Sequence, residues 1–133
     1  MAIALSLSVQ DRERRADEAI PRAVSLRQIL LELGATLTGA EQRLPNFASC
    51  TFAARKGEDM LLALDLAGVA TSSGSACASG SLDPSHVLLA MGMTMEQALG
   101  SLRMTTGYAS TDAEMEIAIS VLRKVLGKAA VRA

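Results

Sequence analysis

The stretch VATSSGSACASGSLDPSHVLLAMG, residues 69–92, is predicted to contain a strand, a loop and a helix. The rest of the chain is predicted to consist of the same three kinds of local structure. Residues 69–72 are predicted to form a short strand. Residues 73–82 are almost wholly Ser, Gly and Ala around one cysteine, so they offer nothing to a core and indicate a loop. Asp83 and Pro84 suit an N-cap and the first helical position, which predicts a helix over 84–91.

The flanking segments show either helical or alternating spacing of their apolar residues. Residues 11–33 have helical spacing with Pro21 inside, which predicts a kink there or two helices that meet. Further strands are predicted at 35–38, 47–54 and 101–106, and further helices at 57–67, 95–99 and 111–127, the last with a capping box of Thr111 and Glu114. The predicted fold class is therefore α/β, in the two-layer α+β sense: a small mixed sheet of about four strands covered by helices.

Composition indicates one domain and excludes several classes of partner. Half of the 133 residues are apolar, which is enough for a core in a chain of this length. The 13 basic and 14 acidic residues are interspersed and aromatic residues make up 2%, so no nucleic-acid partner is expected. No apolar run is long enough to span a bilayer, and the amino-terminal residues do not resemble a signal peptide. We expect a cytoplasmic protein with free thiols and no membrane partner.

The two cysteines have different surroundings in the sequence. Cys77 lies mid-loop between two glycines, without a bulky neighbour to bury it. A nucleophilic thiol needs such access, and spacing alone leaves a reactive and an inert role equally open. Cys50 alternates with Ala48 and Phe52 on the predicted inner face of a strand, which favours a core residue.

Two further polar residues are candidates for a site. Arg103 stands on the strand face opposite Leu102 and Met104, where it is either a surface charge or a planar fork for a substrate carboxylate. His86, the single histidine, could activate a thiol, but Pro84 and the following turn favour a histidine bonded to nearby backbone. One histidine and two separated cysteines cannot form a tetrahedral site, so no metal is expected.

The 69–92 segment closely resembles the active-site cysteine segment of cysteine desulfurases, pyridoxal-phosphate enzymes of the aminotransferase class V group. The similarity is to the iron–sulfur assembly and nitrogen-fixation branch, with its longer cysteine loop. Residues 43–46 (RLPN) resemble the family's strand-entry motif, and residues 60–68 (MLLALDLAG) resemble its following helix. Residues 103–107 resemble the family's arginine strand. The resemblance extends over most of residues 1–127 and implies the small domain of fold-type I pyridoxal-phosphate enzymes.

The resemblance also implies a chemistry and the residues that perform it. Cys77 matches the nucleophile that accepts sulfur from L-cysteine as a persulfide while L-alanine is released. Arg103 matches the arginine that holds the substrate carboxylate, and His86 matches a position expected to be structural. The implied cofactor is pyridoxal phosphate. The implied partners are L-cysteine, a sulfur acceptor or iron–sulfur scaffold protein, and a large-domain chain or homodimer partner.

The chain departs from this family in the residues that hold the cofactor. Its lysines are at 56, 124 and 128, none in a context similar to the cofactor lysine. We therefore expect a carboxy-terminal part that is inactive alone. Residues 1–33 would be a helical lead-in from a large domain, and 34–133 a small domain with the cysteine loop at 72–83. Separated from the large domain, the amino-terminal segment would expose an apolar patch.

Two alternatives stay open on the sequence. The chain could be a non-catalytic, stand-alone persulfide carrier or a remnant that binds a desulfurase. It could also be an unrelated thiol enzyme that uses Cys77 and His86 directly, which requires the base to come within hydrogen-bond reach of the nucleophile.

Overall fold

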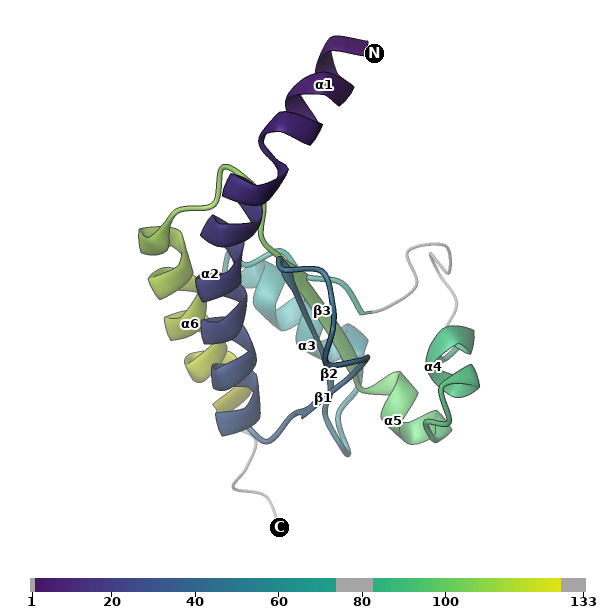
Figure 1. Cartoon of the computed structure of the whole chain (residues 1–133). Helices are drawn as coiled ribbons and strands as arrows, with labels where there is room; N and C mark the ends of the chain where they lie inside the picture. Colours follow the sequence, from purple (N-terminus) through teal and green to yellow (C-terminus); the bar gives the residue numbers. More distant parts are fainter. Residues whose placement is uncertain (1, 74–82, 128–133) are drawn as a thin grey trace.

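The computed structural model describes residues 2–73 and 83–127 of the chain. The elements are α1 (Ala2–Gln10), α2 (Arg12–Glu32), β1 (Thr36–Leu37), β2 (Phe47–Thr51), α3 (Gly57–Leu66), α4 (His86–Ala90), α5 (Met95–Leu99), β3 (Ser101–Thr105) and α6 (Asp112–Leu126) (Figure 1). Helices lie before, between and after the strands, and the sequence predicts helices in all three places.

The three strands form one antiparallel sheet in the order β1-β2-β3. The predicted two-layer α/β class is confirmed, but two details of the sheet were wrong. Within the described residues the sheet has three strands instead of four, and it is antiparallel instead of mixed. The predicted strand at 69–72 is reduced to one bridge, between Ser72 and Arg103. The cause is that the Val69 N–H bonds the Leu64 carbonyl, which ties the start of this segment to the end of α3.

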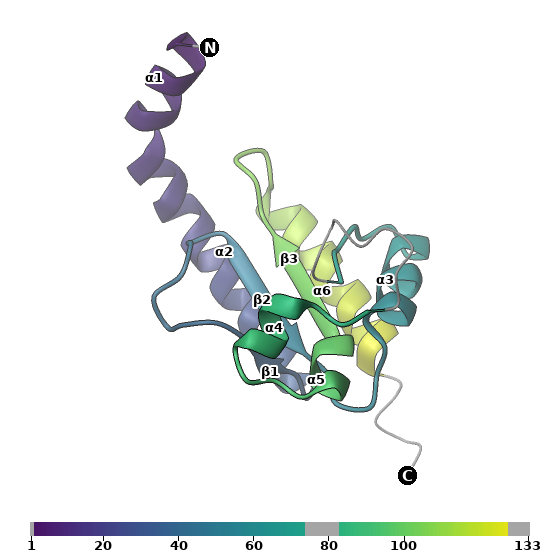
Figure 2. The same ribbon diagram turned by 90° about the vertical axis from the view of Figure 1, so that its right-hand side faces the viewer.

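Helices α2, α6 and α3 cover one face of the sheet, with α4 on the other side (Figures 1 and 2). The core lies between the sheet and this helical layer. On the sheet side it begins with an apolar row across the strands, in which the partly buried Leu37 pairs with Cys50 and Cys50 pairs with Leu102, both of them buried. On the helical side the largest fully buried side chains are Leu30, Leu64, Leu122 and Leu126.

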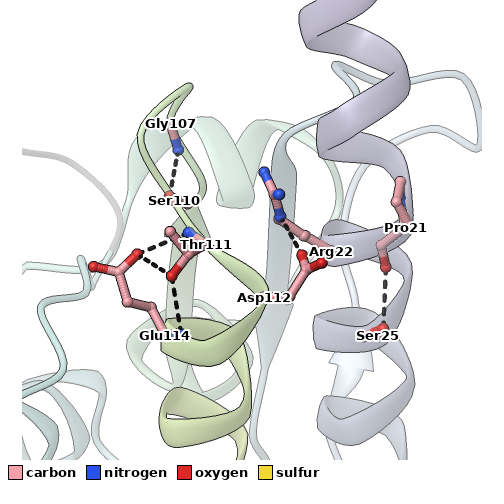
Figure 3. A network of polar contacts seen from close by, with 8 residues as sticks. All are labelled: Pro21, Arg22, Ser25, Gly107, Ser110, Thr111, Asp112 and Glu114. Atoms are coloured by element: carbon pink, nitrogen blue, oxygen red, sulfur yellow. Dashed lines mark hydrogen bonds and ion pairs between the residues drawn. The ribbon is translucent and has the colours of Figure 1, made fainter.

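The predicted capping box at the start of α6 is confirmed. The Thr111 hydroxyl accepts a hydrogen bond from the Glu114 N–H, and the Glu114 carboxylate accepts one from the Thr111 N–H (Figure 3). The Thr111 N–H and the Thr111 hydroxyl both donate to the Glu114 carboxylate, and these two bonds hold the pKa of Glu114 below its usual value. In the next position Asp112 receives a 2.8 Å hydrogen bond from Arg22 of α2, so the start of α6 is also fixed to its neighbour.

Two predicted element boundaries were wrong, and one of the two alternatives at Pro21 is excluded. Helix α2 continues through Pro21, so two helices do not meet there; α1 and α2 instead meet at Asp11, where Arg14 and Arg15 both pair with the carboxylate. Strand β2 ends at Thr51, because the chain then turns and Ala54 takes a left-handed φ of 55°. Helix α4 begins at His86, two residues later than expected.

None of the helices in the described part of the chain has both the length and the apolar character needed to cross a bilayer.

Candidate functional site

The face of the sheet turned away from the helical layer is the floor of a cavity of about 550 Å³. Helix α4 lies in front of β2 on this side (Figure 2). The described residues that line the cavity are Phe47, Ser49, Cys50, Ser101, Leu102 and Arg103 of the sheet, Thr38, Gly39, Arg43 and Leu44 of the β1–β2 connection, and Ser85, His86, Val87, Leu88 and Met91 around α4. Among them are two arginines and one histidine but no carboxylate.

A polar row crosses the floor of this cavity. Thr38 donates its N–H to the Ser49 carbonyl, Ser49 pairs with Arg103, and Arg103 bridges to Ser72. Residues directly opposite each other in antiparallel strands point to the same face, so three hydroxyl side chains and one guanidinium share this face. The neighbouring row, one residue along each strand, is the buried apolar row of the core.

Arg103 is half-buried in the middle of the row. Its neighbours on both sides, Ser49 and Ser72, have short side chains that leave room for the guanidinium. It donates to the Ser72 hydroxyl at 3.4 Å, and within residues 2–73 and 83–127 it forms no ion pair with a carboxylate. A planar guanidinium in this setting can bind a ligand carboxylate bidentately.

The backbone just before residue 74 is held firmly to β3. Ser72 and Arg103 exchange two backbone hydrogen bonds, of 3.0 and 2.7 Å. The Ser101 hydroxyl donates to the Ser73 carbonyl at 2.6 Å. Gly57 packs against the same place, because a Cβ atom there would lie 3.2 Å from the Ser73 Cβ. The segment that carries Cys77 therefore starts beside the guanidinium of Arg103.

The structure separates the four sequence candidates. Arg103 and His86 line one cavity, although His86 is exposed at the first position of α4. Cys77 lies outside the described residues. Cys50 is buried, as predicted, and burial raises the pKa of its thiol to about 12. A thiol that stays protonated at neutral pH cannot act as a nucleophile.

The sequence reasoning missed Arg43 as a candidate. Its guanidinium donates to the Thr38 carbonyl at 3.4 Å and lines the same cavity as Arg103. The two arginines are 60 positions apart in the sequence. Arg43 stands in the RLPN motif, but only the antiparallel register shows that this motif lies next to the polar row.

The described residues do not provide a Schiff-base site for pyridoxal phosphate. Lys56 is the N-cap of α3 and Lys124 is an exposed residue of α6, and neither lines the cavity. No cluster of three His, Cys, Asp or Glu side chains in the described part of the chain could hold a metal ion. The cavity can therefore supply cations and hydroxyl groups for an anionic ligand, but no covalent anchor for that cofactor.

Comparison with known proteins agrees with this fold. The family model described as aminotransferase class-V matches residues 5–117. The chain belongs to this family.

Several curated relatives are similar to the chain, and these are named cysteine desulfurases. A cysteine desulfurase IscS of Clostridium botulinum is 47% identical over 85 residues, which are 64% of this chain and 21% of that protein. A cysteine desulfurase of Gluconacetobacter diazotrophicus is 40% identical over an alignment that covers 95% of this chain and 33% of that protein. The chain thus spans about a fifth to a third of the length of these class-V relatives.

A solved structure is similar to this chain over almost the whole of its length. A NifS-like protein matches with a TM-score of 0.81 and 25% sequence identity, covering 96% of this chain and 32% of that protein. The arrangement of three antiparallel strands under a helical layer is therefore part of a larger known fold.

Proposed function

We propose that this chain acts as the carboxy-terminal part of a cysteine desulfurase. The relatives named cysteine desulfurase support this assignment of the class-V chain. The observation that carries it is the bridge between Ser72 and Arg103, because it starts the Cys77 segment beside a guanidinium that has no carboxylate partner among the described residues.

In this proposal Arg103 holds the carboxylate of L-cysteine and Cys77 accepts its sulfur. Cys77 follows Ser72 by five residues, so an extended chain carries its Cα atom at most about 18 Å from the bridge. A substrate on Arg103 is within that reach. The net conversion turns the Cys77 thiol and L-cysteine into a Cys77 persulfide and L-alanine. One S–S bond replaces one C–S bond, and the atoms balance.

In this proposal the enzyme uses pyridoxal phosphate, but the described residues do not anchor this cofactor. A large segment outside residues 1–133 would hold the cofactor, through the same polypeptide or a separate chain or homodimer partner. Residues 1–33 would connect to it, and 34–133 would form the small domain with the cysteine loop at 72–83. We further propose a cytoplasmic location and a sulfur acceptor or iron–sulfur scaffold protein as recipient of the persulfide sulfur.

The experiment that tests the proposal is alanine release from L-cysteine with added pyridoxal phosphate. The purified chain is assayed alone and after addition of a class-V large domain that contains the cofactor lysine. We expect no release above background from either piece alone, and release from the mixture that Cys77→Ser abolishes. Release that persists in the Cys77→Ser mixture would contradict the assignment of the nucleophile.

Arg103 is tested in the same mixture with a matched pair of variants. Arg103→Gln should raise the KM for L-cysteine strongly, because the carboxylate loses its bidentate partner, whereas Arg123→Gln on the surface of α6 should leave KM unchanged. Equal KM values for the two variants would contradict the role of Arg103.

A persulfide carrier without its own catalysis is the second candidate. It is favoured by one observation, that no described lysine lines the cavity. A carrier would take sulfur on Cys77 from a loaded donor desulfurase, which mass spectrometry detects as a 32-Da addition of one sulfur atom. Sulfur uptake from a donor without alanine release in any large-domain mixture would favour this candidate over the first.

A further inference from the structure

The cavity carries more positive charge than one substrate carboxylate neutralises. Arg43 and Arg103 both line it and both are half-buried. Within the described residues neither forms an ion pair, and no described lining residue is acidic. Each guanidinium brings one positive charge and a planar set of N–H donors to the cavity.

The two guanidinium groups adjoin the same polar row. Arg43 is hydrogen-bonded to the carbonyl of Thr38, which is the first member of the row, and Arg103 is the third member, with Ser49 between them. Two interstrand spacings, roughly 10 Å, separate the backbones of Thr38 and Arg103. One small molecule can therefore reach both arginines along the floor.

The walls beside this row are apolar. Leu44, Val87 and Met91 line the cavity and are more than half exposed. A charge that is partly removed from water is stabilised by a counter-ion with matching hydrogen-bond acceptors. Two such charges in a cavity with apolar walls select a ligand with two anionic groups and an apolar part.

We propose that Arg43 forms a second anion subsite and that the cavity binds an organic dianion, with one carboxylate on Arg103 and the other on Arg43. The two carboxylates are joined by a short apolar or peptide link that lies against Leu44 and α4. Amino acids with one carboxylate occupy only the Arg103 end. This assignment goes beyond the proposed desulfurase role, since it needs neither Cys77 nor a cofactor.

The probes for the test are straight-chain dicarboxylates from succinate to suberate, each compared with the monocarboxylate of equal carbon number. Binding to the full chain is followed at low ionic strength by amide shifts of cavity residues in nuclear magnetic resonance spectra. At least one dicarboxylate should bind about tenfold or more tightly than its monocarboxylate, because it gains a second charge-assisted contact. Equal affinities throughout the series, or no binding by any probe, would overturn the proposal.

Variants locate the second contact. Arg43→Gln should reduce the best dicarboxylate to the affinity of its monocarboxylate, and Arg43→Lys should keep part of the advantage because charge remains without the planar fork. Lys124→Gln on the exposed surface of α6 serves as the control and should change nothing. An unchanged dicarboxylate advantage in Arg43→Gln would overturn the assignment, and circular dichroism verifies that the variant is folded.

The result of the dicarboxylate titration does not depend on the result of the alanine-release assay. The probes contain no sulfur, and the same titration in Cys77→Ser should give the same affinities. Failure of alanine release with a preserved dicarboxylate advantage would reject the desulfurase role alone. Alanine release without that advantage would reject the second subsite alone.

Discussion

Gly100 stands where α5 ends and β3 begins, against the backbone that follows β2. A Cβ atom at this position would lie 2.1 Å from the Phe52 carbonyl oxygen and 3.0 Å from that of Arg55. Both neighbours are backbone, so neither can rotate away. The Gly100 carbonyl also accepts a 2.9 Å hydrogen bond from the Phe52 N–H. This contact sets the start of the strand that carries Arg103.

We predict that Gly100→Ala lowers the free energy of unfolding by about 1–3 kcal/mol, because the methyl group forces the strands apart. Urea unfolding followed by circular dichroism measures the change. Gly107→Ala is the matched control, since a Cβ atom there meets nothing within 4 Å. Equal stability losses in the two variants would show that the close contact at Gly100 is not the cause.

Cys50 gives the chain a dependence on high pH. Burial raises the pKa of its thiol from the ordinary value of 9.0 to about 12. Between these values the unfolded chain releases the thiol proton while the folded chain keeps it, so the folded state is destabilised as pH rises. We predict an extra loss of unfolding free energy of about 1.4 kcal/mol per pH unit above pH 9. Urea unfolding at pH 8 to 11 measures the slope.

Cys50→Ala provides the comparison for that slope. This substitution removes the thiol and leaves the other titrating groups in place. The excess of the wild-type free energy of unfolding over that of Cys50→Ala should therefore decrease from pH 9 upward. A constant stability difference over this range would contradict the role given to the buried thiol.

At the residue scale the sequence predicted burial better than it predicted the site. Alternation alone placed Cys50 in the core, because a period of two assigns each residue of a strand to a face. The same reasoning placed Arg103 on the opposite face. It could not find Arg43, because the proximity of Arg43 to the polar row depends on how β1 and β2 pair, and no local pattern encodes that register.

At the element scale, helix α6 depends on its amino-terminal cap. Thr111 and Glu114 satisfy each other's backbone N–H groups at the start of the helix. We predict that Thr111→Ala lowers the free energy of unfolding by about 1 kcal/mol, while Thr111→Ser, which keeps the hydroxyl acceptor, changes it little. Thermal unfolding by calorimetry measures both. A Ser variant as unstable as the Ala variant would indicate that the Thr111 methyl group, instead of the hydroxyl, is responsible.

The elements that the sequence predicted well are those with strong local signals. The capping box gave the start of α6, and helical periodicity gave α3, α5 and α6 to within about a residue. The strand at 69–72 was overpredicted, because its β character is local while its pairing depends on the end of α3. The start of α4 was misplaced because Asp83 and Pro84 imitate a helix start that Ser85 provides two residues later.

At the scale of the whole molecule, many large apolar side chains of the described residues are exposed. In α1, Ile3 and Leu5 are 79% and 66% exposed, and no residue of this helix is buried. In α4, Val87 and Met91 are more than half exposed. A monomer rarely leaves so many large apolar side chains in water. The chain spans about a third of the length of the similar NifS-like protein, and exposed apolar side chains of this kind mark surfaces that associate.

We predict that the isolated chain self-associates through α1. The double change Ile3→Ser and Leu7→Ser should shift the distribution toward monomer, because it removes two of the exposed apolar side chains of that helix. Sedimentation velocity over a hundredfold range of concentration measures the effect. Leu66→Ser is the control, since Leu66 is 81% exposed but lies on α3, away from α1.

Addition of a class-V large domain should suppress the association in the same way as the double change, because both leave α1 without an apolar surface that is open to a second copy. A wild-type chain that stays monomeric over the whole range would show that α1 is stable in water without a partner.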